Sequence, residues 1–473
     1  MHADRPNLIL IVADTLRADV LGAYGDREVA TPNLDAFAAE AAVFTAAYPE
    51  SLPTIPVRRA LLTGRRAYPF RDYRPLKWDI VYLPGWQPME NDEVALAERL
   101  AAAGYHTGFV ASTLPYFAPG MNFTRGFWQW HYARGLQQDR YRSVHTVTPR
   151  QLERYGSPDQ ARPAPYSTLV YHVANTARRH TEEDTPAAQA YRWAMEFVDD
   201  NRHAEPLFLV VDTFEPHEPW EAPASYLERY ADPGYAGRTV PLVRYGPMAG
   251  QLTEAELRHV RAHYHGLVSL VDTWFGRFID TLKRLGLYDR SVIAFISDHG
   301  TNFGDTPDRI VGKPQTAMYP GVMQLPLLVR FPGGTGAGER FPQLVYNMDL
   351  SATFYAAAGI GDVPVDGQDL YALVSGNRWQ ERDYLTCRYG NELWYRDTRF
   401  WVLLELDGQP RGVFDLEDDP RCQRTLAGTS TIVREVVRRA WQRLLDDAAG
   451  ALPDHRNRPS TDAIGRPRPA QRE

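Results

Sequence analysis

The chain alternates short apolar runs with longer stretches of helical periodicity, and this alternation limits the folds open to it. The apolar runs have the length of buried strands and fall at residues 8–13, 107–111, 207–211, 292–296 and 325–330. Helical patterns lie between them, at residues 34–46, 92–103, 187–200 and 254–285. Strands that are apolar on both faces and separated by helices are typical of an α/β layer fold with a mostly parallel central sheet flanked by helices.

The pattern changes near residue 380. Residues 393–405 and 411–416, separated by a turn at Asp407-Gly408, have the character of antiparallel strands, and residues 432–449 have that of an amphipathic helix. We therefore predict two structural units. A large α/β domain covers residues 1–378, and a smaller C-terminal α+β subdomain with an antiparallel sheet covers residues 379–452.

Two further segments have distinctive compositions. Residues 121–165 are rich in Trp, Tyr, Arg and Gln without clear periodicity, and we expect them to form a long excursion over the active-site edge of the sheet. Within this segment, the aromatic residues at 127–132 could either stack on a substrate ring or pack as a lid. The Arg- and Pro-rich tail at residues 453–473 is expected to be disordered.

The overall composition excludes several classes of partner. The 473-residue chain has 52 Lys and Arg against 59 Asp and Glu, a net charge of −7, which argues against binding nucleic acid. No apolar run is long enough for a membrane span, and the first one is too short for a secretion signal. The two cysteines, Cys387 and Cys422, cannot form a disulfide framework, so we expect a reduced, cytoplasmic setting. A homo-oligomer is left open.

Polar residues follow the predicted strands at the ends where parallel sheets bind their ligands. Asp14 ends the first strand, His217 lies six residues beyond the third, and Asp298 and His299 follow the fourth. Because the carboxyl ends of parallel strands share one edge of the sheet, we expect these side chains to lie together. Two carboxylates and an imidazole suit one divalent cation, with Ca²⁺, Mn²⁺, Mg²⁺ and Zn²⁺ all compatible.

Residues 54–65 read TIPVRRALLTGR. The segment resembles the active-site signature C-x-P-S-R-x-x-L-L-T-G-R of the sulfatase family in the alkaline phosphatase superfamily, with Thr54 at the cysteine position and Pro56 and Arg58 in register. Ser51 cannot replace that cysteine, because counting from it shifts Arg58 by three residues. Seven further segments match the family in order, namely PNLILIVAD at 6–14, TPNLD at 31–35, PHEP at 216–219, SDHG at 297–300, GK at 312–313, PLLVRFPG at 326–333 and FDLEDDP at 414–420.

The resemblance covers nearly the whole chain and implies an alkaline-phosphatase-like core, but it has informative departures. Thr54 stands where the family oxidises its cysteine to formylglycine. Thr15 replaces a second aspartate, as some phosphonate hydrolases have a non-acid there. Ser112 and Leu114 replace the family's Lys and His that handle formylglycine and the sulfate group. The substitutions at Thr54, Ser112 and Leu114 fit together, because each removes a group that takes part in formylglycine chemistry.

A hydroxyl nucleophile needs a base or a metal to activate it. We expect Thr54 to be the nucleophile and a further metal ligand beside Asp14, Asp298 and His299, because a bound metal lowers the pKa of an alcohol and neutralises charge on the ester. Arg58 lies one helical turn beyond Thr54 and could point back at it, and we expect Arg58, His217 and Lys313 to converge on the metal and bind an anion there. His217 and Lys313 could hold the remaining oxygens of a small anionic ester, and either could protonate the leaving group.

The favoured function is hydrolysis of a phosphoester, either a phosphodiester or a phosphonate monoester, through a covalent Thr54 intermediate. A phosphothreonine can be hydrolysed by in-line attack at phosphorus, whereas formylglycine offers an elimination route suited to sulfate. The alternatives are a sulfatase that uses unmodified Thr54, a transferase of phospho-head groups, and a non-catalytic binding protein that retains the metal site. A structural metal would not require Arg58 and Lys313.

Each candidate residue also has a plainer interpretation. Asp14 could cap a helix, Asp298-His299 could form a turn, Arg58 could lie at the surface, His217 and Lys313 could be bystanders, and Thr54 could be a helix cap in an inactive protein. His259 and His263 have the i, i+4 spacing of a zinc site but lack the intervening Glu, so we expect them to be solvated or packed helix residues.

Overall fold

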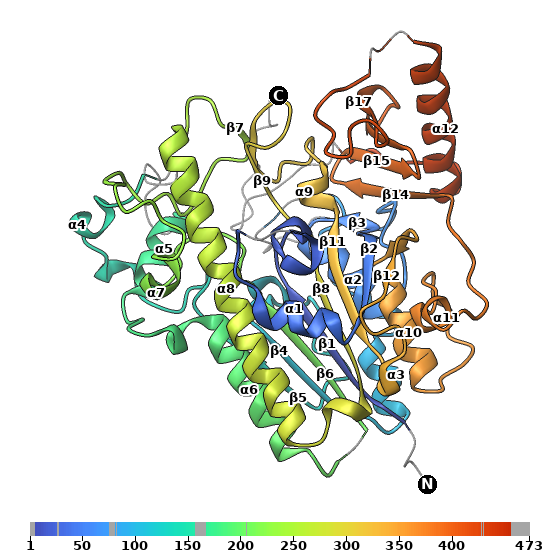
Figure 1. Cartoon of the computed structure of the whole chain (residues 1–473), viewed down its shortest axis with the longest axis horizontal. Helices are drawn as coiled ribbons and strands as arrows, with labels where there is room; N and C mark the ends of the chain where they lie inside the picture. Colours follow the sequence, from blue (N-terminus) through green and yellow to red (C-terminus); the bar gives the residue numbers. More distant parts are fainter. Residues whose placement is uncertain are drawn as a thin grey trace.

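The computed structural model describes residues 5–25, 28–74, 81, 83–156, 167–204, 206–426, 428 and 430–455. Its centre is a nine-stranded sheet in the order β12-β2-β11-β8-β1-β6-β4-β5, with β13 also paired to β2 (Figure 1). The strands are β1 (Asn7–Ala13), β2 (Ala42–Tyr48), β4 (His106–Ala111), β5 (Gln129–Tyr132), β6 (Leu207–Thr213), β8 (Ser291–Ser297), β11 (Leu325–Arg330), β12 (Arg340–Phe341) and β13 (Val345–Tyr346).

All five predicted strands of this sheet are confirmed, as β1, β4, β6, β8 and β11. Only β11 runs antiparallel to its neighbours, and every other pairing in this described sheet is parallel. The mostly parallel α/β architecture expected from the sequence is therefore correct.

Helices cover both faces of the sheet, which explains why its strands are apolar on both sides. Ile9 and Ile11 of β1 pack in one core with α1 (Pro32–Ala39), α6 (Pro186–Asp200) and α8 (Glu254–Arg284). Leu8 and Leu10 pack in the opposite core with α2 (Thr54–Thr63), α3 (Leu96–Ala102) and α10 (Asp349–Ala357). The long helix α8 begins at a capping box, in which Thr253 Oγ1 accepts a hydrogen bond from Glu256 N at 3.2 Å.

One helical prediction was wrong in its second half. Residues 34–46 were expected to form one helix, but α1 ends at Ala39 and β2 begins at Ala42. The alanine-rich composition of this stretch suits a helix, and only the tertiary fold inserts it as a strand between β11 and the β12 and β13 pair. Nearly every residue of β2 is buried, so the segment shows no alternation that could have marked it as a strand.

The predicted excursion at residues 121–165 is not a single irregular segment. Residues 129–132 form β5, which pairs with β4 and closes the sheet at one edge, while residues 157–166 lie outside the described part of the chain. The aromatic residues here are split between core and surface. Phe127 stacks on Phe109 with ring centroids 5.0 Å apart, whereas the Trp128 side chain is 72% exposed.

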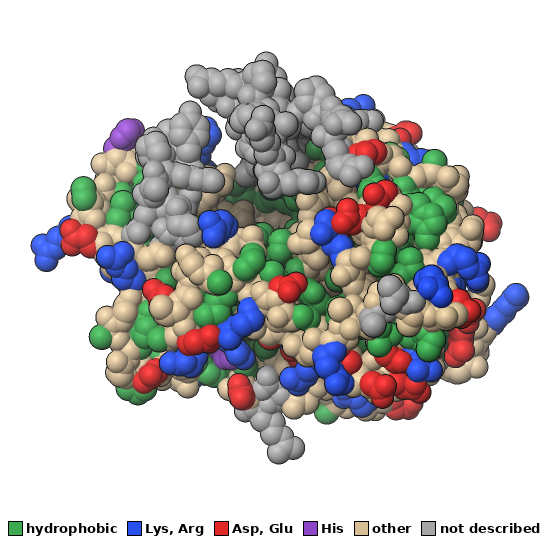
Figure 2. Space-filling model, turned by 90° about the horizontal axis from the view of Figure 1, so that it is seen from above, with side chains coloured by type: hydrophobic (Ala, Val, Ile, Leu, Met, Phe, Trp, Pro, Cys, Tyr) green, Lys and Arg blue, Asp and Glu red, His purple; other side chains and the backbone are tan. Residues whose placement is uncertain are grey.

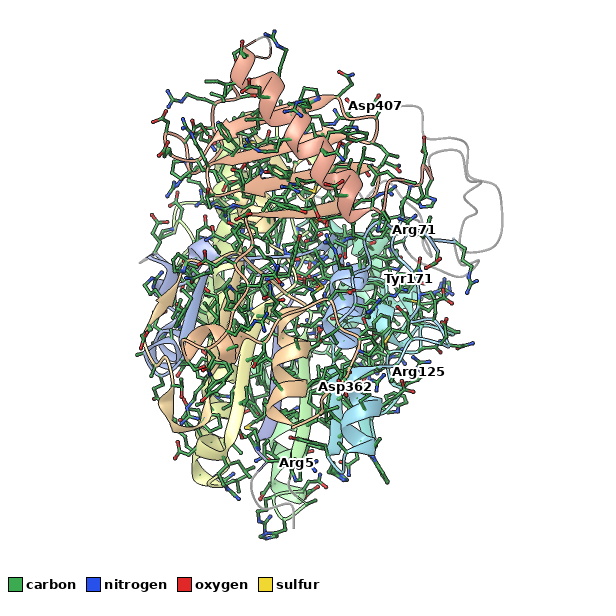
Figure 3. All side chains as sticks on the ribbon, turned by 90° about the vertical axis from the view of Figure 1, so that its right-hand side faces the viewer. Arg5, Arg71, Arg125, Tyr171, Asp362 and Asp407 are labelled. Atoms are coloured by element: carbon green, nitrogen blue, oxygen red, sulfur yellow. The ribbon has the colours of Figure 1, made fainter. Side chains whose placement is uncertain are left out.

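The C-terminal unit is a five-stranded sheet in the order β17-β16-β15-β14-β3 with α12 (Thr431–Asp447) packed on it. Its strands are β14 (Tyr384–Tyr389), β15 (Glu392–Asp397), β16 (Phe400–Glu405), β17 (Pro410–Asp415) and β3 (Ser51–Leu52). The single predicted run at 393–405 is two strands, because Asp397 accepts hydrogen bonds from Arg399 N and Phe400 N and fixes a turn between them. Figure 3 places Asp407, in this unit, and Arg5, just before β1, at opposite ends of the molecule.

Two boundaries differ from the sequence prediction. Ser51 and Leu52 pair in parallel with Arg388 and Tyr389, so a segment next to α2 belongs to the C-terminal sheet rather than to residues 379–452 alone. The start of the tail is packed, because His455 is buried and its Nε2 lies 2.9 Å from Phe70 O. Residues 456–473 of the predicted disordered tail lie outside the described residues. Among those described, no helix has both the length and the apolar character that a membrane crossing needs.

Candidate active site

The predicted metal ligands meet at the carboxyl edge of the central sheet. Asp14 follows β1, and Asp298 and His299 follow the neighbouring β8. All three are buried, and one ligand atom from each lies within 4.8 Å of the others. Backbone donors orient Asp298, whose Oδ1 accepts hydrogen bonds from Thr15 N at 3.0 Å and His299 N at 2.8 Å. Seen from above, this edge of the molecule is hollowed (Figure 2).

Thr54 begins α2 and points into this cluster. Its side chain is buried, and its Oγ1 lies 3.4 Å from His299 Nε2. The carbonyl of Gly300 faces His299 Nδ1 at 3.1 Å and can only accept a hydrogen bond, so Nδ1 is the protonated ring nitrogen and Nε2 offers its lone pair toward Thr54. Pro53, rather than Thr54, is the N-cap residue, so the plain cap interpretation of Thr54 does not describe the structure.

Arg58 is fully buried, which excludes the surface interpretation. The contacts of its guanidinium group also differ from those expected of a residue that binds the ester directly. Its Nε and Nη2 donate to both oxygens of Asp212 at 2.8 and 3.0 Å, and its Nη1 donates to Asp298. The same Nη2 lies 3.0 Å from Asp14 Oδ2. Every guanidinium nitrogen therefore faces a carboxylate, and the geometry favours a role in positioning these carboxylates over direct contact with an anion.

Asp212, the main partner of Arg58, was missed by the sequence reasoning. It is the penultimate residue of β6 and is fully buried, and it also accepts hydrogen bonds from Thr113 Oγ1 at 2.9 Å and Tyr116 Oη at 2.7 Å. A signal was present, because Asp212 ends an apolar run just as Asp14 does. Nearby Ser112, one of the family departures, accepts a hydrogen bond from Phe214 N at 2.7 Å.

Lys313 reaches the cluster from the other side. It follows β10 (Ile310–Gly312), and its Nζ donates to Thr15 Oγ1 at 3.2 Å and to Glu218 Oε2 at 3.0 Å. Thr15 Oγ1 in turn donates to Asp14 Oδ1 at 2.7 Å. Thr15 holds this position with a left-handed φ of 61°, which is unfavourable for a β-branched residue and marks local strain beside the site.

His217 lies beside the same residues, in the segment that follows β6. Its Nδ1 donates to the backbone carbonyl of Glu218 at 2.6 Å, which leaves Nε2 unprotonated. Burial and the nearby Lys313 ammonium lower the pKa of His217 well below the usual value, so the neutral ring prevails. A neutral His217 accepts protons, which makes it a poor candidate for protonating the leaving group.

The charges of the cluster suit a divalent cation. Burial and the neighbouring Asp298 carboxylate raise the pKa of Asp14 well above its ordinary value, while Arg58 lowers the pKa of Asp298 to about 2 against the effect of burial. Burial lowers the pKa of His299 to about 4, so its ring is neutral and able to bind a metal. Asp14 Oδ2 is buried and accepts no well-aligned hydrogen bond. Such a donor set, with an incompletely satisfied carboxylate, fits a divalent metal ion.

The remaining candidates lie elsewhere. His259 stacks on Tyr235 at 4.1 Å, and His263 Nδ1 accepts a hydrogen bond from Ala222 N at 3.1 Å, so both are packed helix residues. A cavity of about 670 Å³ is lined in part by Glu215, Pro219 and Glu221, and the residues that line it include none of the predicted site residues. Both cysteines are buried free thiols.

Comparison with known proteins places the chain in a family. The sulfatase family model matches residues 6–360. Among characterised relatives, the chain is 24% identical to an arylsulfatase of Clostridium perfringens, over 88% of this chain and 89% of that protein. It is 25% identical to a choline-sulfatase of Rhizobium meliloti, over 95% of this chain and 89% of the relative.

Solved structures agree on the fold. A phosphonate monoester hydrolase of Agrobacterium radiobacter superposes with a TM-score of 0.69 at 21% identity, covering 94% of this chain and 96% of that one. The phosphonate monoester hydrolase of Silicibacter pomeroyi gives a TM-score of 0.67 at 22% identity over 99% of this chain and 100% of that chain. Since the family model spans most of the sequence, the chain belongs to the sulfatase family of ester hydrolases.

Proposed function

We propose that this protein is a metal-dependent hydrolase of phosphodiesters or phosphonate monoesters that works through a covalent phosphothreonine at Thr54. The observation that carries the proposal is the position of the Thr54 hydroxyl, which begins a helix and lies 3.4 Å from His299 Nε2, beside Asp14 and Asp298. The start of a helix favours an anion, so an ester bound there would have its phosphorus close to the hydroxyl.

Asp14, Asp298 and His299 would hold the metal, with Thr54 Oγ1 as a further ligand. When bound there, a divalent cation lowers the pKa of the Thr54 hydroxyl and neutralises charge on the ester. The protein supplies the positioning. Arg58 holds the carboxylates in place through its buried contacts, and the hydrogen bond from His299 Nδ1 to Gly300 O keeps Nε2 available as a ligand beside Thr54.

The chemistry proceeds in two displacements. In the first, the Thr54 hydroxyl releases its proton to solvent and Oγ forms a bond to phosphorus. The bond from phosphorus to the ester oxygen breaks, and Lys313 donates a proton to the departing alkoxide, which leaves as the alcohol. In the second, water attacks the phosphothreonine in line with Thr54 Oγ, and the unprotonated Nε2 of His217 accepts a proton from that water. The bond from phosphorus to Oγ breaks, and His217 passes the proton to Thr54 Oγ. A phosphodiester thus releases a phosphate monoester and a phosphonate monoester releases a phosphonate, while the Thr54 hydroxyl is regenerated and Lys313 regains its proton from solvent.

The nucleophile can be tested by substitution and trapping. Thr54→Ala should reduce turnover of an aryl phosphodiester by on the order of a thousandfold or more while leaving the protein folded, and Thr54→Ser should retain part of the activity. Thr63→Ala is a matched control, because Thr63 ends the same helix and its hydroxyl donates to Arg59 O and accepts from Arg65 N, at the opposite end of the helix from Thr54. Acid quench during turnover should leave a phosphoryl group on the peptide that contains Thr54. Full activity in Thr54→Ala would overturn the mechanism.

A sulfatase using unmodified Thr54 is the second candidate, because the aligned relatives include an arylsulfatase and a choline-sulfatase. Paired assays separate the two. An aryl sulfate, an aryl phosphodiester and an aryl phosphonate monoester with the same leaving group should be compared at saturating metal. Higher kcat/KM for the two phosphorus esters supports the proposal, and higher kcat/KM for the sulfate would favour the second candidate.

A further inference from the structure

The ammonium group of Lys313 is paired with a carboxylate inside the site. Glu218 accepts from Lys313 Nζ through Oε1 at 3.2 Å and Oε2 at 3.0 Å, and both side chains are buried. A third contact joins Lys313 Nζ to Thr15 Oγ1 at 3.2 Å. An ammonium has three N–H donors, so these contacts leave Lys313 at most one for an ester oxygen. The Glu218 carboxylate also compensates the positive charge of Lys313.

Glu218 is held firmly in this position. It lies between His217 and Pro219 in the segment after β6, and its Oε1 accepts a hydrogen bond from Tyr245 Oη. Tyr245 precedes β7 (Gly246–Pro247), which pairs with β10 just before Lys313. The Tyr245 ring packs over Gly312, where an added Cβ would lie only 2.3 Å from Tyr245 Cδ1. Gly312, with a left-handed φ of 76°, therefore lets Tyr245 reach Glu218.

Neither of the two cationic side chains placed at this site is free to balance the charge of an anionic substrate. Arg58 faces Asp14, Asp212 and Asp298, and Lys313 faces Glu218. Four carboxylates thus stand against two cationic side chains, and one divalent cation brings the cluster to neutrality. A substrate with one negative charge enters a neutral site. A substrate with two charges places the second one near Glu218 without a cation to offset it.

We propose that Glu218 is a specificity-determining residue that selects esters with one negative charge over phosphate monoesters with two. This inference rests on the proposed function and names the substrate class of the same site. Phosphodiesters and phosphonate monoesters carry one charge, whereas an ionised phosphate monoester carries two. Like charges close together in a buried site repel strongly, because water cannot screen them there, and such repulsion is an effective means of rejecting a competing ligand.

Binding of two matched ligands tests the proposal without requiring turnover. The ligands are phenylphosphonate, fully ionised as a dianion at the chosen pH, and its monomethyl ester, a monoanion. Titration calorimetry on the metal-loaded protein should show that the wild type binds the ester at least about tenfold more tightly than the dianion. Glu218→Gln keeps the shape and an acceptor for Lys313 but removes the charge. It should shift the ratio toward the dianion by about tenfold or more.

Tyr245→Phe is the control, because it removes one hydrogen bond to Glu218 and leaves the carboxylate charge in place. Its ester-to-dianion ratio should match the wild type even if both affinities fall. An unchanged ratio in Glu218→Gln, or a wild type that prefers the dianion or fails to bind the ester, overturns the inference. The proposed function fails on a different result, namely a wild type that binds the ester yet hydrolyses neither a phosphodiester nor a phosphonate monoester.

Discussion

The Arg58 and Asp212 pair should be the main electrostatic anchor of the site, and a double-mutant cycle can measure it. Both side chains are fully buried, and two hydrogen bonds of 2.8 and 3.0 Å join them. The cycle uses two single variants and the double variant. Arg58→Met replaces the guanidinium with an unbranched apolar side chain, and Asp212→Asn keeps the shape of the carboxylate without its charge. Removing one member of a buried ion pair leaves its partner uncompensated, which costs about 3–5 kcal/mol of unfolding free energy.

The two single variants should differ in a defined order. After Asp212→Asn, Arg58 still faces Asp14 and Asp298, so the loss should lie near the lower limit, about 3 kcal/mol. After Arg58→Met, three buried carboxylates lose their cation, so the loss should reach about 5 kcal/mol. The double variant should be less destabilised than the sum of the two, with a coupling free energy of roughly 2–3 kcal/mol.

Urea unfolding in the presence of a chelator gives these values, because bound metal would otherwise add stability by mass action. The same variants should then be titrated with Mn²⁺. Freed from Asp212, Arg58 should compete more strongly for Asp14 and Asp298, so Asp212→Asn should bind metal more weakly than the wild type. Additive stability losses, within about 0.5 kcal/mol, would refute the view that Arg58 and Asp212 stabilise each other.

Three further predictions concern single carboxylates. Asp14→Asn should weaken Mn²⁺ binding more than about a hundredfold, measured by competition with a fluorescent chelator, and near-normal affinity would remove Asp14 from the ligand set. In the wild type, the raised pKa of Asp14 means that protons compete with the metal for this ligand. Metal affinity should therefore fall on acidification at a higher pH than it would with an ordinary carboxylate ligand. A metal affinity that stays constant down to pH about 4 would contradict this. Burial raises the pKa of Asp272 to about 6, although it accepts a hydrogen bond from Leu34 N at 2.7 Å. The folded state therefore holds this proton more tightly than the unfolded chain, so stability should decline as pH rises from about 4 to about 6, and Asp272→Asn should abolish that part of the slope in urea midpoints.

The strands and the cluster of candidate metal ligands could be predicted from the sequence because both depend on local signals. Each apolar run predicts a strand, and the residue after the run predicts a position at the sheet edge, which is how Asp14, Asp298 and His299 were found. Thr54 was found by its register in a motif. For β2, local signals were insufficient, because its alanine-rich, almost entirely buried sequence suits a helix equally well.

The contacts that set the electrostatics of the site are not local. Glu218 and Lys313 are 95 residues apart, and Arg58 and Asp212 are 154 residues apart, so no spacing rule predicts which charge faces which. The sequence therefore predicted Arg58 and Lys313 as ligands for an anion. The structure instead pairs each of them with buried carboxylates, and only the folded arrangement shows how little of their charge is left for a substrate.

The pairing of β3 with β14 has a consequence for how the protein matures as it is made. Ser51 and Leu52 lie just before Thr54, yet their strand partners are Arg388 and Tyr389, which emerge from the ribosome more than 300 residues later. Long-range pairings form late, because the intervening chain must first be closed into a loop. The peptide that carries Thr54 thus gains its final support only after most of the chain has been synthesised, and a nascent chain halted before residue 384 should carry most of the site residues without an active site.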